Sequence, residues 1–442
     1  MAEEVGVTRT LLVGVALLLA GLGAGRAMAA PTEVAFVGWG GPEEREIVKG
    51  VLANFERANP DVKVKYTQIP GVGYDYYNKI RLMIVAGIAP DVFYVPDDKF
   101  GELASRNVLL NLDGRVAKSH VVKLADMWET GYNRYRWDGR QLQKGPLYCL
   151  PKDIGPWAMF YNKDAFKQAG VAPPPADHAL SYDEAIAIWK KLSFKAGSSQ
   201  HYGVSTFPHE VAVWSNGGQI VSADKRHWVL GKDAKSIAAV QWCADLALVQ
   251  GVAPNLSRTV AGSSAASPGE LFESGLAACH FDGRWLVPHY RQTVKFDWDV
   301  APFPAPHKGE TATTFSGSVG YGVFAKTAKP DASWRLIEYL AGPEGQTQMT
   351  RSGFQVPNQR SLAATDVYLQ RAQKPAHAEV FLEAAAHSRP GPWTDTPNVF
   401  WHDVYWNFVG KVFRGDKRAS ELLPKLVPMV DNALVENNDF GK

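Results

Sequence analysis

The sequence predicts an α/β protein with two domains, and two observations carry this prediction. Segments with strand character alternate with amphipathic helical segments over the first hundred residues. The chain has 442 residues, of which 46% are hydrophobic and 21% charged, so it is globular and too long for a single core. We therefore expect a parallel sheet covered by helices, with ligand-binding residues at the carboxyl ends of its strands.

The expected elements follow one another in the order strand, helix, strand, helix, strand. They are a strand over 33–37, a helix over 43–58, a strand over 62–66, a helix over 76–86 and a strand over 91–95. Trp39 and Asp98 follow the first and third of these strands. Both residues are therefore expected at the ligand-binding edge of the sheet.

The N-terminus has the pattern of a secretory signal peptide. An apolar run over 11–22 is followed by Arg26 and by Ala27 and Ala29, whose spacing fits a cleavage site. The run is shorter than the roughly 20 residues that span a membrane. We expect a signal peptide over 1–29, a mature start near Ala30 and a location in the periplasm or another extracytoplasmic space. No cysteine follows the run, so no lipid anchor is expected.

Charge and cysteine content narrow the choice of partners and sites. With 47 basic and 45 acidic residues, the chain has no excess charge that would attract nucleic acid, so no nucleic-acid partner is expected. Cys149, Cys243 and Cys279 have no metal-ligand spacing. A disulfide between Cys243 and Cys279 is one alternative, and three buried free thiols are the favoured one.

Residues 152–166, with the sequence KDIGPWAMFYNKDAF, form the strongest motif. Taken alone, this segment predicts a strand followed by a helix with Asn162 as its N-cap. It resembles the signature of the family 1 extracellular solute-binding proteins, the maltose- and multiple-sugar-binding group. Further segments match this family in the same order along the chain. They are FERANP at 55–60, APDVF at 89–93, DKF at 98–100, WSNGG at 214–218, GLAA at 275–278, DGRW at 282–285, SGSVG at 316–320, GPEGQ at 342–346 and GFQVP at 353–357.

The resemblance implies a periplasmic-binding-protein-like fold, in which two α/β lobes surround a ligand cleft and are joined by several hinge crossings. By analogy, lobe one comprises residues 31–150 and 319–345, and lobe two comprises residues 151–317 and 346–442. The implied function is that of the substrate-binding subunit of an ABC importer, a monomer that captures a sugar or sugar-like solute by hinge closure. Its partners would be the membrane permease and its ATPase. The resemblance implies no cofactor, metal or catalytic residue.

Sugar chemistry selects the candidate binding residues, because a pyranose packs its C–H face on an aromatic ring and its hydroxyls need donors and acceptors. In lobe one the candidates are Trp39, Glu43, Asp98 and Lys99. The resemblance matches Asp98 and Lys99 to a sugar-contacting pair of the family. Loop packing for Trp39, a helix-dipole effect for Glu43 and a surface ion pair for the other two are the alternatives.

Lobe two supplies the remaining candidates. They are Asp153 and Trp157 beside the first crossing, Trp214 and Asn216 before a Gly-Gly turn, Gly283 and Trp285, and Ser316 and Gly317 where the chain crosses back. Trp285 matches a stacking residue of the family. Trp393, Trp401 and Trp406 are possible additions, although the aromatic run that includes Trp401, Tyr405 and Phe408 is typical of a helix core.

Two other functions remain open at this point. An exported chain rich in tryptophan and carboxylates is also compatible with a glycoside hydrolase that uses paired acids. Tyr74, Tyr76 and Tyr77 raise the alternative of ferric-ion binding through phenolate oxygens. The identity, length and charge of the solute cannot be inferred from the sequence.

Overall fold

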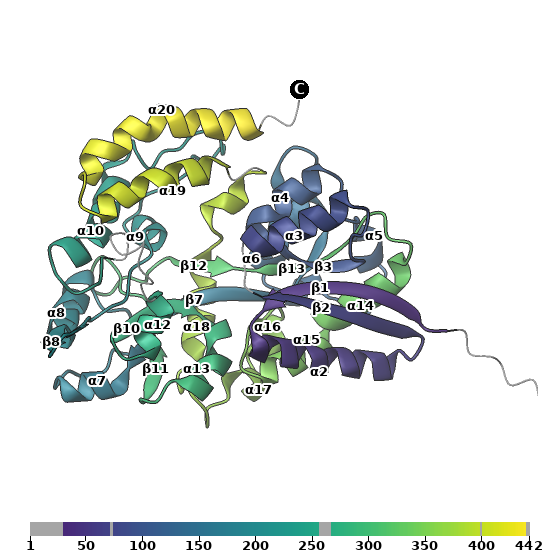
Figure 1. Cartoon of the computed structure of the whole chain (residues 1–442), viewed down its shortest axis with the longest axis horizontal. Coiled ribbons are helices and arrows are strands. Elements are labelled where there is room, and N and C mark those ends of the chain that lie inside the picture. The colour runs from purple at the N-terminus through teal and green to yellow at the C-terminus, as the bar shows by residue number, and fades with distance from the viewer. Residues whose placement is uncertain (1–29, 71–73, 256–266, 398–399, 439–442) are drawn as a thin grey trace, which may run out of the picture.

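The computed structural model describes residues 30–70, 74–255, 267–397 and 400–438. Two lobes lie side by side, each with its own β-sheet and hydrophobic core (Figure 1). This confirms the predicted two-lobed α/β fold. The expected signal peptide lies outside the described residues.

The sheet of lobe one is built mainly from the N-terminal third of the chain. Its strands are, in spatial order, β2 (Val62–Pro70), β1 (Thr32–Gly40), β3 (Val92–Pro96), β13 (Val319–Val323) and β6 (Cys149–Pro151). The first three are parallel, as predicted, and β13 and β6 each run antiparallel to their neighbours. The carboxyl ends of β1 and β3 therefore lie together, which brings Trp39 to the same edge of the sheet as Asp98.

Helices surround this sheet because each has one apolar face. In α2 (Pro42–Ala58) the buried Val48, Val51, Leu52 and Phe55 recur at helical spacing, and Pro42 occupies the first turn. The other helices of this part of the chain are α3 (Tyr74–Val85), α4 (Asp97–Ser105), α5 (Asp113–Val116), α6 (Glu129–Tyr132), α14 (Pro330–Ala341), α15 (Pro343–Arg351), and the short η1 (Leu124–Asp126) and η2 (Asn133–Tyr135). A two-stranded ribbon comprises β4 (Arg136–Trp137) and β5 (Leu142–Leu147).

Lobe two is organised around the long strand β7 (Asp153–Asn162). It pairs antiparallel with β10 (Cys279–Gly283), β11 (Trp298–Ala301), β12 (Thr314–Gly317) and β14 (Val356–Pro357), and β15 (Ser388–Arg389) extends the sheet beside β12. This sheet is thus mainly antiparallel. The partners of β7 come from distant parts of the chain. A separate ribbon comprises β8 (Phe194–Ala196) and β9 (Ser199–His201).

The helices of lobe two pack around β7 and on one another (Figure 1). They are α7 (Lys163–Gln168), α8 (Tyr182–Leu192), α9 (His209–Ser215), α10 (Ala234–Leu248), α12 (Pro268–Glu273), α13 (Val287–Thr293), α16 (Arg360–Ala363), α17 (Asp366–Leu369), α18 (Glu379–Ala386), α19 (Phe400–Phe413), α20 (Ala419–Asn438), η3 (Arg284–Leu286) and η4 (Pro392–Asp395). Asn162 caps α7 as predicted, because its Oδ1 accepts a hydrogen bond of 2.9 Å from the Ala165 N–H.

The cysteines bear on covalent cross-links, and the described helices bear on membrane spans. Cys149, Cys243 and Cys279 are all buried and free, which confirms the favoured alternative of three thiols. Burial raises the pKa of Cys279 to about 12 and raises that of the other two thiols well above the usual value. Among the helices that the structure describes, none combines the length and the apolar character needed to cross a bilayer.

Three segments cross between the lobes and meet at Lys152. β6 passes into β7 at Lys152, β12 passes into β13 at Ser318, and residues 352–355 connect α15 to β14. The Lys152 carbonyl accepts hydrogen bonds from Gln346 Nε2 (2.9 Å) and Gln355 Nε2 (3.3 Å), and its N–H donates to the Val319 carbonyl (2.7 Å). We call Lys152, Asp153, Ser318, Val319, Gln346 and Gln355 the crossing cluster. The lobe limits given above stay a prediction, and Met349 and Phe354 pack with the core of lobe one.

Buried charges surround the crossing cluster. The Lys152 side chain is 3% exposed and forms ion pairs with Asp153 (2.9 Å) and Glu44 (3.6 Å). Burial acts to lower the pKa of Lys152, but the two carboxylates outweigh it and the pKa lies above its usual value. Burial raises the pKa of Glu44 to about 7, against the opposing effect of Lys152. The lobes are therefore joined by a charge cluster that is removed from water.

A second buried cation joins lobe one to the strand that crosses back. The Arg134 side chain is 1% exposed, and its Nη1 lies 2.7 Å from Asp97 Oδ2. The same guanidinium donates to the Ser316 carbonyl (3.1 Å) and to the Ser316 hydroxyl (3.2 Å). Burial raises the pKa of Asp97 to about 6, and Arg134 opposes this rise.

The burial of this pair predicts a large stability loss on its disruption. In Arg134→Met, Asp97 keeps its buried position without its cation, so we expect the free energy of unfolding to fall by about 3–5 kcal/mol. Arg106→Met is the matched control, because Arg106 is exposed and pairs with Glu102 at the surface, a pair worth about 1 kcal/mol or less. Denaturant unfolding of both variants measures the difference, and equal losses would contradict this account of Arg134.

Candidate ligand-binding site

The Trp285 ring lies between the lobes in a space left by two glycines. Trp285 follows β10, in η3, and packs against the core of lobe one. A Cβ on Gly283 would lie 2.0 Å from the Trp285 ring, and a Cβ on Gly155 would lie 2.8 Å from it. Both glycines are therefore needed for the position of the ring, since any side chain there would displace it.

Trp285 is the first ring of a row along lobe two. Its centroid lies 6.3 Å from that of Trp157, and Trp157 lies 5.1 Å from Phe315. The row continues from Phe315 to Trp393 at 5.5 Å, from Trp393 to His402 at 5.0 Å, and from His402 to Trp406 at 5.7 Å. We call these six residues the aromatic row. They come from η3, β7, β12, η4 and α19, so only the folded chain assembles them.

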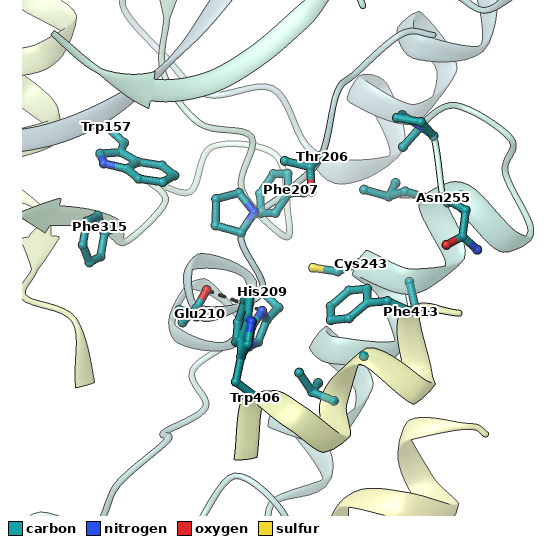
Figure 2. Close-up of a pocket in the computed structure, with 18 of the residues that line it drawn as sticks. Trp157, Thr206, Phe207, His209, Glu210, Cys243, Asn255, Phe315, Trp406 and Phe413 are labelled. Carbon is teal, nitrogen blue, oxygen red and sulfur yellow. Dashed lines mark ion pairs between the residues drawn. The ribbon is translucent and has the colours of Figure 1, made fainter. Parts of the chain in front are cut away.

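Five members of the aromatic row line a pocket of about 590 Å³ in lobe two, the exception being Trp285. Figure 2 shows Trp157 and Phe315 at one end of this pocket and Cys243 and Phe413 at the other. Its volume is within the range of about 300–1,000 Å³ that is usual for small-molecule sites.

Two polar atoms of the pocket lining lack a hydrogen-bond partner. Trp157 Nε1 and His402 Nε2 are buried, and neither has a partner within the described part of the chain. Such atoms are costly unless something else satisfies them, so both are suited to contact a ligand. Burial lowers the pKa of His402, which favours a neutral ring that donates from one nitrogen and accepts at the other. The carboxylates of Glu210 and, to a smaller extent, Asp403 and Asp98 oppose this lowering of the pKa.

A buried carboxylate also lines the pocket. Glu210 Oε2 lies 3.5 Å from His209 Nδ1, a pair drawn in Figure 2. His209 Nε2 is in turn 2.5 Å from the Tyr405 hydroxyl. Burial lowers the pKa of His209, so the ring is held neutral and leaves the carboxylate without a full counter-charge. Glu210 is thus available to accept hydrogen bonds from a ligand.

The candidates of lobe one lie at the facing edge of its sheet. Trp39 is half-buried and edge-on to Tyr76 (4.8 Å) and Tyr94 (5.1 Å), which fix its ring. Glu43 lies 3.5 Å from His289 of lobe two and so connects the lobes. Asp98 and Lys99 pair at 3.0 Å and are both partly exposed.

The geometry is that of two lobes with polar and aromatic side chains on their facing surfaces, and the comparison with known families agrees. The model of the bacterial extracellular solute-binding protein family matches residues 40–347, well over half of the chain. The chain belongs to this family. The resemblance inferred from its motifs is thereby confirmed.

Individual members of the family are similar over most of their length. The galactooligosaccharide-binding protein of Bacillus subtilis is 24% identical over 82% of this chain and 81% of its own. The multiple sugar-binding protein of Streptococcus mutans is 22% identical over 66% of this chain and 67% of its own. An ABC substrate-binding protein from Listeria monocytogenes, solved in complex with cycloalternan, superposes with a TM-score of 0.78 at 22% identity, over 92% of this chain and 99% of that one.

Two predicted site residues of this solute-binding protein lie elsewhere. Trp214 is 7% exposed and belongs to the core of lobe two, and the Asn216 side chain donates to the Lys235 carbonyl at 3.0 Å. The Gly-Gly turn that follows serves packing, because a Cβ on Gly218 would lie 2.3 Å from Ser236 Oγ. The structure thus does not bring these two residues to the aromatic row, and their contact with a ligand stays a prediction.

Four other predicted residues have structural roles in the connection between the lobes or beneath the aromatic row. Asp153 pairs with Lys152, and the carbonyl and hydroxyl of Ser316 accept from Arg134, so their polar groups are already engaged. Gly317 faces Gly155 across the β7–β12 pair, and Gly283 makes room for Trp285. Direct ligand contact by these four has no support in the geometry, whereas Trp157 and Trp285 gain support.

Sequence reasoning missed part of the pocket lining. It did not select Phe315, Glu210 or His402, and it named Trp393 and Trp406 only as additions. The sequence did offer a signal for Phe315. It directly precedes Ser316 in a strand, and neighbouring strand residues point to opposite faces of the sheet, so Phe315 points to the face opposite that of Ser316. Trp401 is fully buried in the core, as the helical spacing indicated, while Trp406, in the same helix, is 51% exposed and lines the pocket.

The ferric-ion alternative is disfavoured by the tyrosines that motivated it. Tyr76 and Tyr77 are buried, and burial raises the pKa of both hydroxyls well above the usual value. The Tyr76 hydroxyl also donates to the Tyr94 carbonyl at 2.9 Å. Tyr74 lies at the start of α3.

The glycine contacts of Trp285 lead to a direct test of its position. We expect Gly283→Ala to displace the Trp285 ring and to change its contact with Trp157. In spectra of protein labelled with ¹⁵N-tryptophan, the indole signals of these two residues should shift most. Gly50→Ala is the control, because nothing lies within 4 Å of a Cβ there, and it should leave the indole signals in place. An unshifted Trp285 signal in Gly283→Ala would contradict the packing described here.

Proposed function

We propose that this chain is the extracytoplasmic substrate-binding subunit of an ABC importer and that it captures a carbohydrate between its lobes. The observation that carries the proposal is the aromatic row, together with the unpartnered Trp157 Nε1 and His402 Nε2 beside it. The names of the B. subtilis and S. mutans relatives and the bound cycloalternan of the L. monocytogenes protein support the same class of ligand.

The aromatic row fits both the C–H face and the hydroxyl groups of a sugar. The C–H face of a pyranose packs on Trp285 or Trp157, and its hydroxyls need partners at the ring edge. Trp157 Nε1 donates to a hydroxyl, and neutral His402 either donates or accepts at Nε2. Glu210 and, from lobe one, Asp98 accept hydrogen bonds. Trp39, Glu43 and Lys99 complete the proposed lobe-one face.

Capture works by lobe closure. A ligand that touches both faces binds the closed arrangement better than the open one and shifts the equilibrium by that difference. Lobe two meets lobe one through the Glu43–His289 pair, while the crossing cluster holds the hinge side. The closed form is then the one that the permease and its ATPase recognise.

The proposed location and partners follow from this role. The segment 1–29 would direct export to the periplasm or an equivalent space, without a lipid anchor, and the subunit would act as a monomer. It would release its solute unchanged to the permease. A glycoside hydrolase is the competing function, and it differs in that the bound glycan is cleaved.

Trp285 gives the sharpest test of the proposed site. Native mass spectrometry of freshly purified protein identifies the co-purified solute, and calorimetry then measures its affinity. We expect Trp285→Ala to weaken binding by about 2 kcal/mol or more, roughly a thirtyfold loss, because a buried aromatic anchor dominates such interfaces.

Trp214→Ala is the matched control. Trp214 belongs to the core of lobe two, so its truncation should lower the free energy of unfolding by about 3–5 kcal/mol and leave the affinity of the folded protein unchanged. A Trp285→Ala variant with lower stability but intact affinity would remove Trp285 from the site. Recovery of a cleaved glycan would replace the proposed function with the hydrolase.

A further inference from the structure

The far end of the lobe-two pocket differs from the aromatic row in its chemistry. Here the wall between α10 and α19 is formed by Cys243, Ala244, Leu246, Ala247, Val409 and Phe413. Five of these side chains are hydrocarbon. The sixth, Cys243, stays a neutral thiol because burial raises its pKa well above the usual value. We call these six residues the apolar wall.

The apolar wall cannot satisfy a second sugar ring. A hydroxyl buried against these six side chains would lose its water without gaining a partner among them, which is unfavourable. Thr206 and Asn255 are polar residues that also line the pocket, outside the apolar wall. Burying an alkyl or aryl group against the wall is favourable, because the contact removes apolar surface of both the group and the wall from water. Contact with the apolar wall therefore favours an apolar group.

The two ends belong to one pocket and so act on one ligand. Figure 2 shows Trp157 and Phe315 of the aromatic row on the side of the pocket opposite Cys243 and Phe413, with Phe207 between them. The unpartnered nitrogens, Trp157 Nε1 and His402 Nε2, belong to the aromatic row, whereas the apolar wall offers no titratable group besides the thiol. A molecule that spans the pocket therefore meets the unpartnered nitrogens of the aromatic row on one side and the hydrocarbon surface of the apolar wall on the other.

We propose that the solute is an amphipathic glycoside, whose sugar lies against the aromatic row and whose alkyl or aryl substituent lies against the apolar wall. This inference rests on the proposed carbohydrate function and adds the chemical class of the substituent. It distinguishes the chain from a binder of plain oligosaccharides, for which the apolar wall would have no use.

Matched glycosides test the inference. Calorimetry compares the methyl and n-octyl β-glycosides of glucose, galactose, mannose and maltose, all below the concentration of micelle formation. We expect at least one octyl glycoside to bind tenfold or more tightly than its methyl partner. Ala247→Trp, which fills the far end from α10, should lower the affinity of the octyl glycoside to that of its methyl partner.

Ala238→Trp is the matched control for the substitution. Ala238 is exposed on the same helix and does not line the pocket, so the variant should keep the preference for the octyl glycoside. If circular dichroism shows that Ala247→Trp does not fold, Val409→Phe fills the same end from α19 and carries the test.

The outcomes separate this inference from the proposed function. Equal affinities of methyl and octyl partners overturn the amphipathic glycoside and leave carbohydrate capture standing. Binding of n-octanol, blocked by Ala247→Trp, with no glycoside bound, overturns carbohydrate capture and with it the sugar half of the inference. If neither the octyl glycosides nor n-octanol bind, the apolar wall holds no such group and the inference fails.

Discussion

The meeting of three chain segments at Lys152 is the constraint on which the rest of the structure depends. Its carbonyl joins Gln346 and Gln355, its N–H joins Val319, and its buried ammonium pairs with Asp153 and Glu44. A charge so far from water is tolerated only when its partners stay in place, so this cluster resists rearrangement. The segments that join the lobes are thereby held together at one buried point.

Strand pairing next to Lys152 determines the geometry of the aromatic row. β7 leaves the crossing at Asp153, and four residues later Trp157 pairs with Gly283 on one side. On the other side, the pairing of Pro156 with Ser316 brings Phe315 beside Trp157. The missing side chain of Gly283 leaves the space that Trp285 fills. The register of β7 with its neighbouring strands thus determines where the rings lie. A shift of this register by one residue would turn Trp157 and Phe315 away from the cleft.

Local patterns predicted those features that neighbouring residues determine. The apolar spacing of α2, the alternation in β2 and the cap at Asn162 are all readable within a few residues, and Trp285 was recognisable from its motif. Glu210 and His402 could not be selected in this way, because contacts between distant segments bring them to one pocket. Trp214 shows the limit of a local pattern, since a tryptophan before a glycine turn has the same pattern in a core as in a binding site, and here it packs in the core of lobe two.

The three buried thiols carry a consequence for the covalent chemistry of the chain. Thiol–disulfide exchange requires an accessible thiolate, and burial raises the pKa of Cys149, Cys243 and Cys279. The three cysteines of the folded chain are therefore expected to stay thiols in a reducing and in an oxidising compartment. Packing, hydrogen bonds and buried charge pairs, and no disulfide among these three cysteines, then stabilise the fold.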